Sequence, residues 1–240
     1  MSISFSQKVL SWSDSHGRHD LPWQHNRTPY RVWVSEIMLQ QTQVITVIPY
    51  FVKFVNRFPD LESLARASDD DVMSMWSGLG FYSRARNLHK AAKIMMEDHN
   101  SQIPNTFDAL IALPGIGRST AGAILSLSRI EPRAILDGNV KRVLSRFYSV
   151  QGDLKASKTQ KELWQLAEKC LPHKDYDLYT QAIMDLGATV CTPKKAMCSM
   201  CPLSKDCSAL EKDTVYLLPN KALRKKKRRE SIYFMIIKDS

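Results

Sequence analysis

The sequence predicts an all-α protein, and two observations support this fold class. Apolar residues recur every three or four positions along most of the chain, which is the spacing of amphipathic helices. No alternating strand pattern occurs before residue 231, and glycine- or proline-containing connectors separate the helical segments. The chain has 240 residues, 44% of them apolar and 24% charged, which is an ordinary globular composition. We therefore expect one or two helical cores.

The expected helices follow in chain order. Apolar spacing from Phe5 to Trp12 predicts a first helix that ends near Gly17, and Pro22 makes the next connector extended. Thr28 before Pro29 is a typical helix start, so a second helix is expected over 30–42. Acidic first turns mark two short helices that follow a longer one. The later segments are 44–58, 60–67, 69–76, 82–99, 106–112, 119–128, 140–147, 157–171 and 176–191.

A glycine-rich turn separates the helical segments 106–112 and 119–128. It reads Pro114-Gly115-Ile116-Gly117 and is followed by Arg118 and Ser119. Its glycines allow close backbone approach to another surface, and the first amides of the next helix have no intrahelical partner. Such a helix-hairpin-helix can hold a phosphate through main-chain N–H groups. The same residues also suit a simple corner between two helices, and the pattern alone leaves both readings open.

Two acidic residues occupy positions where they could do chemistry. On a helix, Glu36 neighbours Val32, Trp33 and Leu39, and desolvation by such neighbours raises the pKa of a carboxyl group, as a general acid requires. A solvated surface glutamate is the ordinary alternative. Asp137 precedes the segment 140–147, where an aspartate is most often an N-cap. Beside a DNA-binding hairpin it would also be placed to face a flipped nucleotide.

Four of the five cysteines are crowded into 17 residues. Cys191, Cys198, Cys201 and Cys207 are separated by six, two and five residues, whereas Cys170 lies on an apolar helical face and is expected to be core. Four thiolates at this spacing fit a tetrathiolate site, for which zinc and a [4Fe–4S] cluster are the candidates. Spacing by itself favours zinc.

The net charge of +10 favours a polyanionic partner. Charge alone does not separate DNA from RNA or a membrane surface. No apolar run is long enough to span a bilayer, and the first residues lack a signal pattern, so we expect a cytoplasmic protein, nucleoid-associated if bacterial. Six consecutive cations at 224–229 predict a solvated linker that could touch DNA, and 232–237 reads as a β-strand without a partner.

From about Phe5 to Pro219 the chain resembles the adenine-specific mismatch branch of the helix-hairpin-helix DNA glycosylases. The resemblance rests on Ser-Glu-Ile-Met-Leu-Gln-Gln-Thr at 35–42, the hairpin, Asp-Gly-Asn at 137–139 and the cysteine spacing. It implies a two-lobed fold, with a six-helix barrel over 28–131 and a second lobe formed by 1–27 and 132–214. It also implies that the four clustered cysteines bind one [4Fe–4S] cluster and not zinc. Residues 215–240 would be a basic linker and the first strand of a Nudix-like domain that the chain otherwise lacks.

The resemblance implies hydrolysis of the N-glycosidic bond of adenine mispaired with 8-oxoguanine or guanine in double-stranded DNA. Glu36 would protonate the adenine, Asp137 would stabilise the sugar cation and Asn139 would orient the site. Strand-cutting members of the superfamily carry lysine at the position of Ser119. A monofunctional, monomeric enzyme is therefore expected, which leaves an abasic site for a downstream endonuclease.

The resemblance also implies the DNA contacts. Gln41 and Phe81 would be wedged into the duplex beside the lesion; the family usually has tyrosine at the position of Phe81, so any bond made by that hydroxyl is lost here. The complete set of expected DNA contacts is Leu39, Gln41, Thr42, Phe81, Tyr82, Arg84, Arg86, Gly115, Gly117 and Arg118.

Two other functions are compatible with parts of this pattern. One is a pyrimidine-lesion glycosylase and lyase of the same fold, against which Ser119 and Glu36 both argue. The other is a non-catalytic iron–sulfur module that binds mismatched duplex and releases no base.

Overall fold

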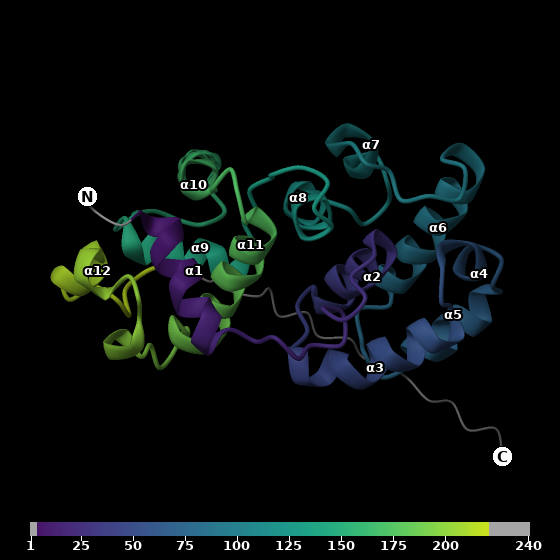
Figure 1. The fold of residues 1–240 in the computed structure, drawn as a ribbon, viewed down its shortest axis with the longest axis horizontal. Coiled ribbons are helices and arrows are strands. Elements are labelled where there is room, and N and C mark those ends of the chain that lie inside the picture. Colours follow the sequence, from purple (N-terminus) through teal and green to yellow (C-terminus); the bar gives the residue numbers. More distant parts are fainter. Residues whose placement is uncertain (1–3, 221–240) are drawn as a thin grey trace, which may run out of the picture.

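The computed structural model describes residues 4–220, and within that range the protein is helical without any β-strand (Figure 1). The predicted all-α class is therefore confirmed. The basic run at 224–229 and the apolar segment at 232–237 lie outside the described residues. No described helix is both long and apolar enough to cross a membrane.

Twelve α-helices occur in the described range, and most match the expected segments to within a few residues. They are α1 Phe5–His16, α2 Pro29–Leu39, α3 Val44–Arg57, α4 Leu61–Ala65, α5 Asp69–Trp76, α6 Ser83–Asp98, α7 Phe107–Ile111, α8 Arg118–Leu127, α9 Gly138–Phe147, α10 Ser157–Cys170, α11 Tyr176–Asp185 and α12 Ser208–Glu211. A π-helical turn, η1 Leu186–Val190, continues α11, and two 3₁₀ turns, η2 Cys198–Met200 and η3 Ser204–Asp206, lie between the cysteines.

Side-chain caps fix where several helices begin. The Thr28 hydroxyl accepts a hydrogen bond from Arg31 N, and Pro29 occupies the first helical position of α2, as predicted. Asp60 and Ser68 cap α4 and α5 in the same way. At α9 the cap is Asp137, so the helix begins at Gly138, two residues before the predicted apolar pattern. The cap therefore fixes the backbone position of Asp137, one of the two candidate catalytic carboxylates.

The helices form two groups that meet along α8 and α11 (Figure 1). In one group α2 packs on α3, α6 and α8, and α6 packs on α4 and α5. In the other, α9 packs on α10, α11, α12 and η1, and α1 returns from the start of the chain to pack on α11. This arrangement agrees with two lobes, and we retain 28–131 and 1–27 with 132–214 as their proposed boundaries.

Aromatic side chains build the core behind α2. Trp33, Phe51, Phe54, Phe58 and Trp76 are fully buried, and Phe54 packs edge-to-face against both Phe58 and Trp76. Because α2 is surrounded by this core, a polar side chain on its remaining face is held rigidly.

Candidate active site

A pocket of about 220 Å³ lies where the two groups of helices meet. Its volume is several times the roughly 30 Å³ that a water molecule takes up in the liquid, so it admits a much larger group. Both candidate carboxylates line it, and a wider groove of about 790 Å³ adjoins it at Asp137. The pocket residues are Arg18, Leu21, Trp23, Glu36, Leu39, Gln40, Thr42, Val44, Ser119, Thr120, Asp137, Asn139, Gln181, Met184 and Ala188.

Glu36 reaches the pocket from α2. The residues on either side of it, Ser35 and Ile37, are buried, and Glu36 itself is half-buried and lines the pocket. Burial raises the pKa of Glu36 to about 8, and the nearby negative charge of Asp137 adds to the shift. Glu36 therefore holds a proton at neutral pH in the free protein, which a general acid needs.

Asp137 reaches the same pocket from the N-terminus of α9. Its carboxylate accepts hydrogen bonds from Val140 N at 2.7 Å and from Asn139 Nδ2 at 3.1 Å. Burial raises the pKa of Asp137, while these bonds and the positive charge of Arg142 oppose that shift. The two carboxyl groups thus share one cavity but have different surroundings, since only Asp137 has donors that stabilise its ionised form.

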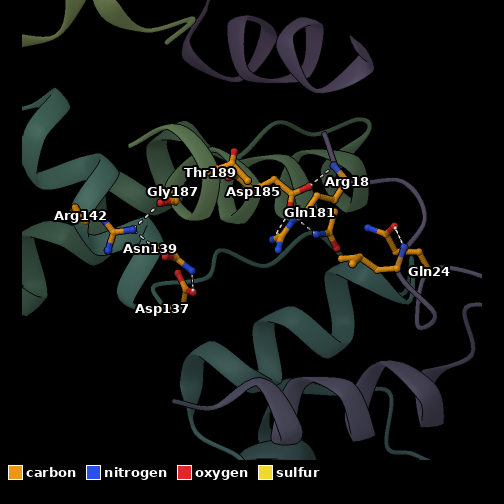
Figure 2. Close-up of polar contacts among 10 residues, drawn as sticks. Arg18, Gln24, Asp137, Asn139, Arg142, Gln181, Asp185, Gly187 and Thr189 are labelled. Carbon is orange, nitrogen blue, oxygen red and sulfur yellow. Dashed lines mark hydrogen bonds and ion pairs between the residues drawn. The ribbon is translucent and has the colours of Figure 1, made fainter. Parts of the chain in front are cut away.

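Arg142 joins Asn139, the partner of Asp137, to Gly187 (Figure 2), and it also contacts the cysteine region. Its Nη2 donates to Asn139 Oδ1 at 2.9 Å and to the Gly187 carbonyl at 2.6 Å, and its Nε donates to the Cys191 carbonyl at 2.7 Å. At Gly187 a Cβ atom would lie 2.6 Å from that of Asn139, so only glycine fits there. These contacts fix the orientation of the Asn139 amide that donates to Asp137.

Two polar residues that line the pocket, Arg18 and Gln181, and the buried Asp185 that binds both were not anticipated from the sequence (Figure 2). Asp185 is 0% exposed and accepts hydrogen bonds from Arg18 N, Nε and Nη2 at 2.8, 2.9 and 2.5 Å. It also accepts from Gln181 Nε2 at 2.9 Å. Gln181 itself lines the pocket, and with its amide nitrogen bonded to Asp185 its amide oxygen remains available as an acceptor. Arg18 and Gln181 lie in distant segments that contain no recognisable motif, so no sequence signal joined them.

Ser119 lines the pocket but has a structural partner. Its hydroxyl oxygen accepts a hydrogen bond from Leu136 N at 3.0 Å, which braces the segment that leads into Asp137. No lysine lines the pocket or the adjoining groove. No amine is therefore placed beside Asp137 by the residues around these two cavities.

Several predicted DNA-contact residues are exposed at the rim of the site. Gln41 is exposed and lines the groove together with Thr42 and Leu39. Phe81 is 54% exposed and Tyr82, its neighbour, is exposed as well. The hairpin residue Gly115 has a φ of +81°, which requires glycine, and Gly117 precedes α8 as its N-cap residue.

Arg118 and Arg86 are exposed, and neither lines the pocket. Arg118 donates to Glu168 at 2.6 Å and lies 3.8 Å above the Trp164 ring. Arg86 lines a separate hollow between α5 and α6, together with Asp69 and His89. Their assignment as DNA contacts stays a prediction.

Arg84 is placed differently from the prediction that it contacts DNA. Its side chain is buried, at 7% exposure, and its guanidinium group donates to oxygen atoms of the protein. Periodicity did not reveal this position, because an arginine with polar residues such as Ser83 and Arg86 nearby is typical of a helix surface. The expectation that Arg84 lies at the surface is therefore wrong, because its side chain lies inside the protein.

The four clustered cysteines line one small cavity, and none of them forms a disulfide. Arg146 adjoins the cavity, and its Nη1 donates to Cys191 Sγ at 3.3 Å. Burial raises the pKa of Cys201 to about 12 and that of Cys198 and Cys207 above the usual range. No group of three or more metal-binding side chains within residues 4–220 already has coordination geometry. Four thiols around one cavity are nevertheless the donor set of a tetrathiolate site.

Comparison with known sequences gives a consistent picture. The profile of the HhH-GPD superfamily base excision DNA repair protein matches residues 34–169. The adenine DNA glycosylase of Buchnera aphidicola subsp. Acyrthosiphon pisum is 48% identical over 234 residues, covering 98% of this chain and 67% of that protein. The adenine DNA glycosylase of Homo sapiens is 41% identical over 218 residues, covering 87% of this chain and 40% of that protein.

Solved structures show the same fold. A thermostable thymine-DNA glycosylase has a TM-score of 0.77 and 28% identity, covering 87% of this chain and 95% of that one. A non-covalent endonuclease III–DNA complex has a TM-score of 0.70 and 19% identity, covering 85% and 94%. The helical framework is therefore shared well beyond recognisable sequence similarity.

Proposed function

Because the chain belongs to the HhH-GPD superfamily of base excision DNA repair proteins, we propose that it is an adenine DNA glycosylase. Its substrate is adenine mispaired with 8-oxoguanine or guanine in double-stranded DNA, and its reaction is hydrolysis of the N-glycosidic bond. The observation that carries the proposal is the placement of Glu36 and Asp137 in one pocket, with the pKa of Glu36 raised to about 8.

The reaction begins with extrusion of the adenine nucleotide, since the glycosidic bond is out of reach within the base stack. Glu36 donates its proton to a ring nitrogen, so the electron pair of the breaking bond leaves with a neutral base. Ionised Asp137 stabilises the positive charge that develops on the sugar, as one of two carboxylates does in glycoside hydrolysis. Water then adds to the anomeric carbon and returns a proton to a carboxylate, leaving an abasic site.

Asn139 and Gln181 position these groups. Asn139 donates to Asp137 and is itself held by Arg142. The amide nitrogen of Gln181 already donates to Asp185. The amide oxygen of Gln181 can therefore accept a hydrogen bond from the exocyclic amine of adenine. This polarity disfavours a base that presents a carbonyl at the same edge.

The enzyme is proposed to be monofunctional. A lyase step needs an amine that forms a Schiff base with the sugar, and the residues around the pocket and groove include Ser119 and no lysine. The abasic product would pass to a separate abasic-site endonuclease. We also propose that the protein acts as a monomer in the cytoplasm, or at the nucleoid in a bacterium.

One [4Fe–4S] cluster is proposed for Cys191, Cys198, Cys201 and Cys207, which line one cavity. When bound, such a cluster supplies cross-linking of the loops around η2 and η3 without entering the reaction. Elemental analysis of the purified protein separates this cluster from zinc: iron and acid-labile sulfide in equal amounts support the proposal, and one zinc ion contradicts it.

One assay separates the adenine glycosylase from its two alternatives. The protein is incubated with a duplex containing adenine opposite 8-oxoguanine, and strand breaks are compared before and after hot alkali. Breaks that need alkali support the proposal, and breaks without alkali support a lyase. If no breaks form although the duplex is bound, the protein is a non-catalytic DNA-binding module.

A further inference from the structure

Two residues at the rim of the site have unusual backbone conformations. Gln41 and Phe81 are exposed, and neither is glycine, yet their φ angles are +59° and +50°. A positive φ is a genuine outlier for a bulky residue such as phenylalanine. Strained conformations of this kind persist only where the surrounding structure holds them in place. Something must therefore hold both loop tips, although they are forty residues apart in the sequence.

One buried side chain, Arg84, contacts both loops. Its Nη1 donates to the carbonyls of Ile37, Met38 and Gln40, the last at 2.5 Å, and its Nη2 donates to Thr42 Oγ1 at 3.0 Å. On the other loop Nη2 donates to the carbonyls of Leu79 and Gly80 at 3.4 and 3.2 Å. The acceptors thus bracket Gln41 on one side and precede Phe81 on the other.

Two aromatic rings complete the surroundings of Arg84. Its guanidinium carbon lies 5.3 Å from the centre of the Phe81 ring and 5.5 Å from that of Trp76, within the range of cation–π attraction. The Trp76 indole also donates to the Gly80 carbonyl at 3.1 Å. The Arg84 guanidinium group therefore contacts the Phe81 ring and also binds the loop that precedes Phe81.

The charge of Arg84 is accommodated without an acidic partner among residues 4–220. Three of its acceptors are carbonyls at the C-terminal end of α2, where the helix leaves carbonyls without intrahelical partners and carries partial negative charge. Because α2 also carries Glu36, Arg84 fixes both loop tips relative to the catalytic helix itself.

We propose that Arg84 is a positioning residue that sets Gln41 and Phe81 at a fixed separation, so that both enter the duplex together and favour extrusion of the target nucleotide. The inference rests on the proposed function, because it takes mispaired DNA as the substrate. Side chains inserted between base steps unstack them, and a rigid pair is more effective than two independent loops, since no loop ordering remains to be done on binding.

A double-mutant cycle tests this role. Arg84→Lys keeps the charge but loses the two-nitrogen fork, and we expect the single-turnover rate of adenine excision to fall about tenfold. In a background that lacks both inserted side chains, Gln41→Ala with Phe81→Ala, the same change should cost less than about twofold, because the side chains through which Arg84 acts are gone. Arg66→Lys, at an exposed arginine that directly follows α4, is the matched control and should leave the rate unchanged. Equal losses in both backgrounds, or no loss at all, would overturn the proposal.

A second readout measures extrusion without chemistry. With 2-aminopurine as the target base and Glu36→Gln in every protein, fluorescence increases when the base leaves the stack. Arg84→Lys should lower this increase while the melting temperature of the protein stays within a few degrees of the parent. An unchanged increase refutes the positioning role. Because this readout needs no excision, it remains informative if the wild-type protein releases no adenine, an outcome that contradicts the proposed function alone.

A milder variant covers the case in which Arg84→Lys does not fold. Thr42→Val removes one acceptor of Arg84 beside Gln41 and keeps the side-chain shape. We expect about a threefold loss of the excision rate that again disappears when Gln41 and Phe81 are both alanine. A loss that persists in the alanine background would show that Thr42 acts independently of the wedge and would count against the coupling.

Discussion

The two carboxylates of the pocket lie on regions built in opposite ways. Glu36 projects from the middle of α2, where buried apolar neighbours leave its charge without compensating donors. Asp137 caps α9, where a backbone amide, the Asn139 amide and Arg142 all favour its ionised form. The difference shows how one cavity can hold a protonated acid and a charged stabiliser together: the acid comes from a helix interior, and the anion from a helix N-terminus.

The different roles of the two carboxyl groups are tested most directly by replacing each of them with its neutral amide. Glu36→Gln cannot donate a carboxylic proton and Asp137→Asn cannot stabilise a cation, so each should reduce single-turnover excision by about 10³-fold or more. Binding of the mismatched duplex, measured by fluorescence anisotropy, should stay close to that of the wild type. If either variant retained a rate within tenfold of the wild type, its carboxyl group would have no catalytic role.

The pH dependence separates the two regions further. Because the pKa of Glu36 is about 8 in the free protein, the catalytic proton is present below that pH and is lost above it. We expect kcat/KM for excision to fall about tenfold per pH unit above 8, since this parameter reports groups of the free enzyme. Residual activity of Glu36→Gln should not show this decline. A wild-type profile that is flat to pH 10 would rule out Glu36 as the acid.

The Asp137 side depends on the contact between Asn139 and Gly187. A methyl group at Gly187 would displace Asn139, because its Cβ would lie 2.6 Å from that of Asn139. Gly187→Ala should therefore lower the excision rate by about 10- to 100-fold, the usual effect of moving a catalytic group slightly. The iron content of the variant is the control, because Gly187 is not one of the four cysteines proposed to bind the cluster and its substitution should leave iron binding unchanged. Full activity with unchanged iron would show that Asn139 does not need its present orientation.

The smallest effect is expected on stability. A raised pKa means that the folded protein favours protonated Glu36, so this residue has no cost at low pH and destabilises the fold as pH rises from 4.5 to about 8. Glu36→Gln removes that cost and should raise the free energy of unfolding at pH 8 by about 4 kcal/mol, with no gain at pH 4. Thermal denaturation of this variant beside Glu162→Gln, on the exposed face of α10, measures the difference. An equal gain at both pH values would show that ionisation of Glu36 is not the cause.

Much of the fold followed from local sequence signals. Thr28 with Pro29 set the start of α2, and apolar spacing placed α3, α6 and α10 to within a residue or two. The segment 176–191 was expected to be one helix, but α11 ends at Asp185 and a π-helical turn follows. Periodicity does not register this change, since apolar residues continue through the turn on a similar face.

The parts of the site that remained hidden are tertiary. Asp185 is a buried carboxylate whose charged partner, Arg18, lies 167 residues away in the sequence. Arg84 stands among polar residues and would pass for a surface side chain, yet carbonyls from two loops surround it. Such positions have no local signature, because their partners are chosen by how the helices pack and not by spacing along the chain.

The return of α1 to pack on α11 has a consequence for biosynthesis. The ribosome releases α1 first, but its partner leaves some 160 residues later. The helices from α2 to α7 pack on one another or on α8 and can assemble while translation continues. Until α11 emerges, the apolar side of α1 with Val9 and Trp12 lacks this partner. We therefore expect chaperones to bind this side of α1 in the nascent chain.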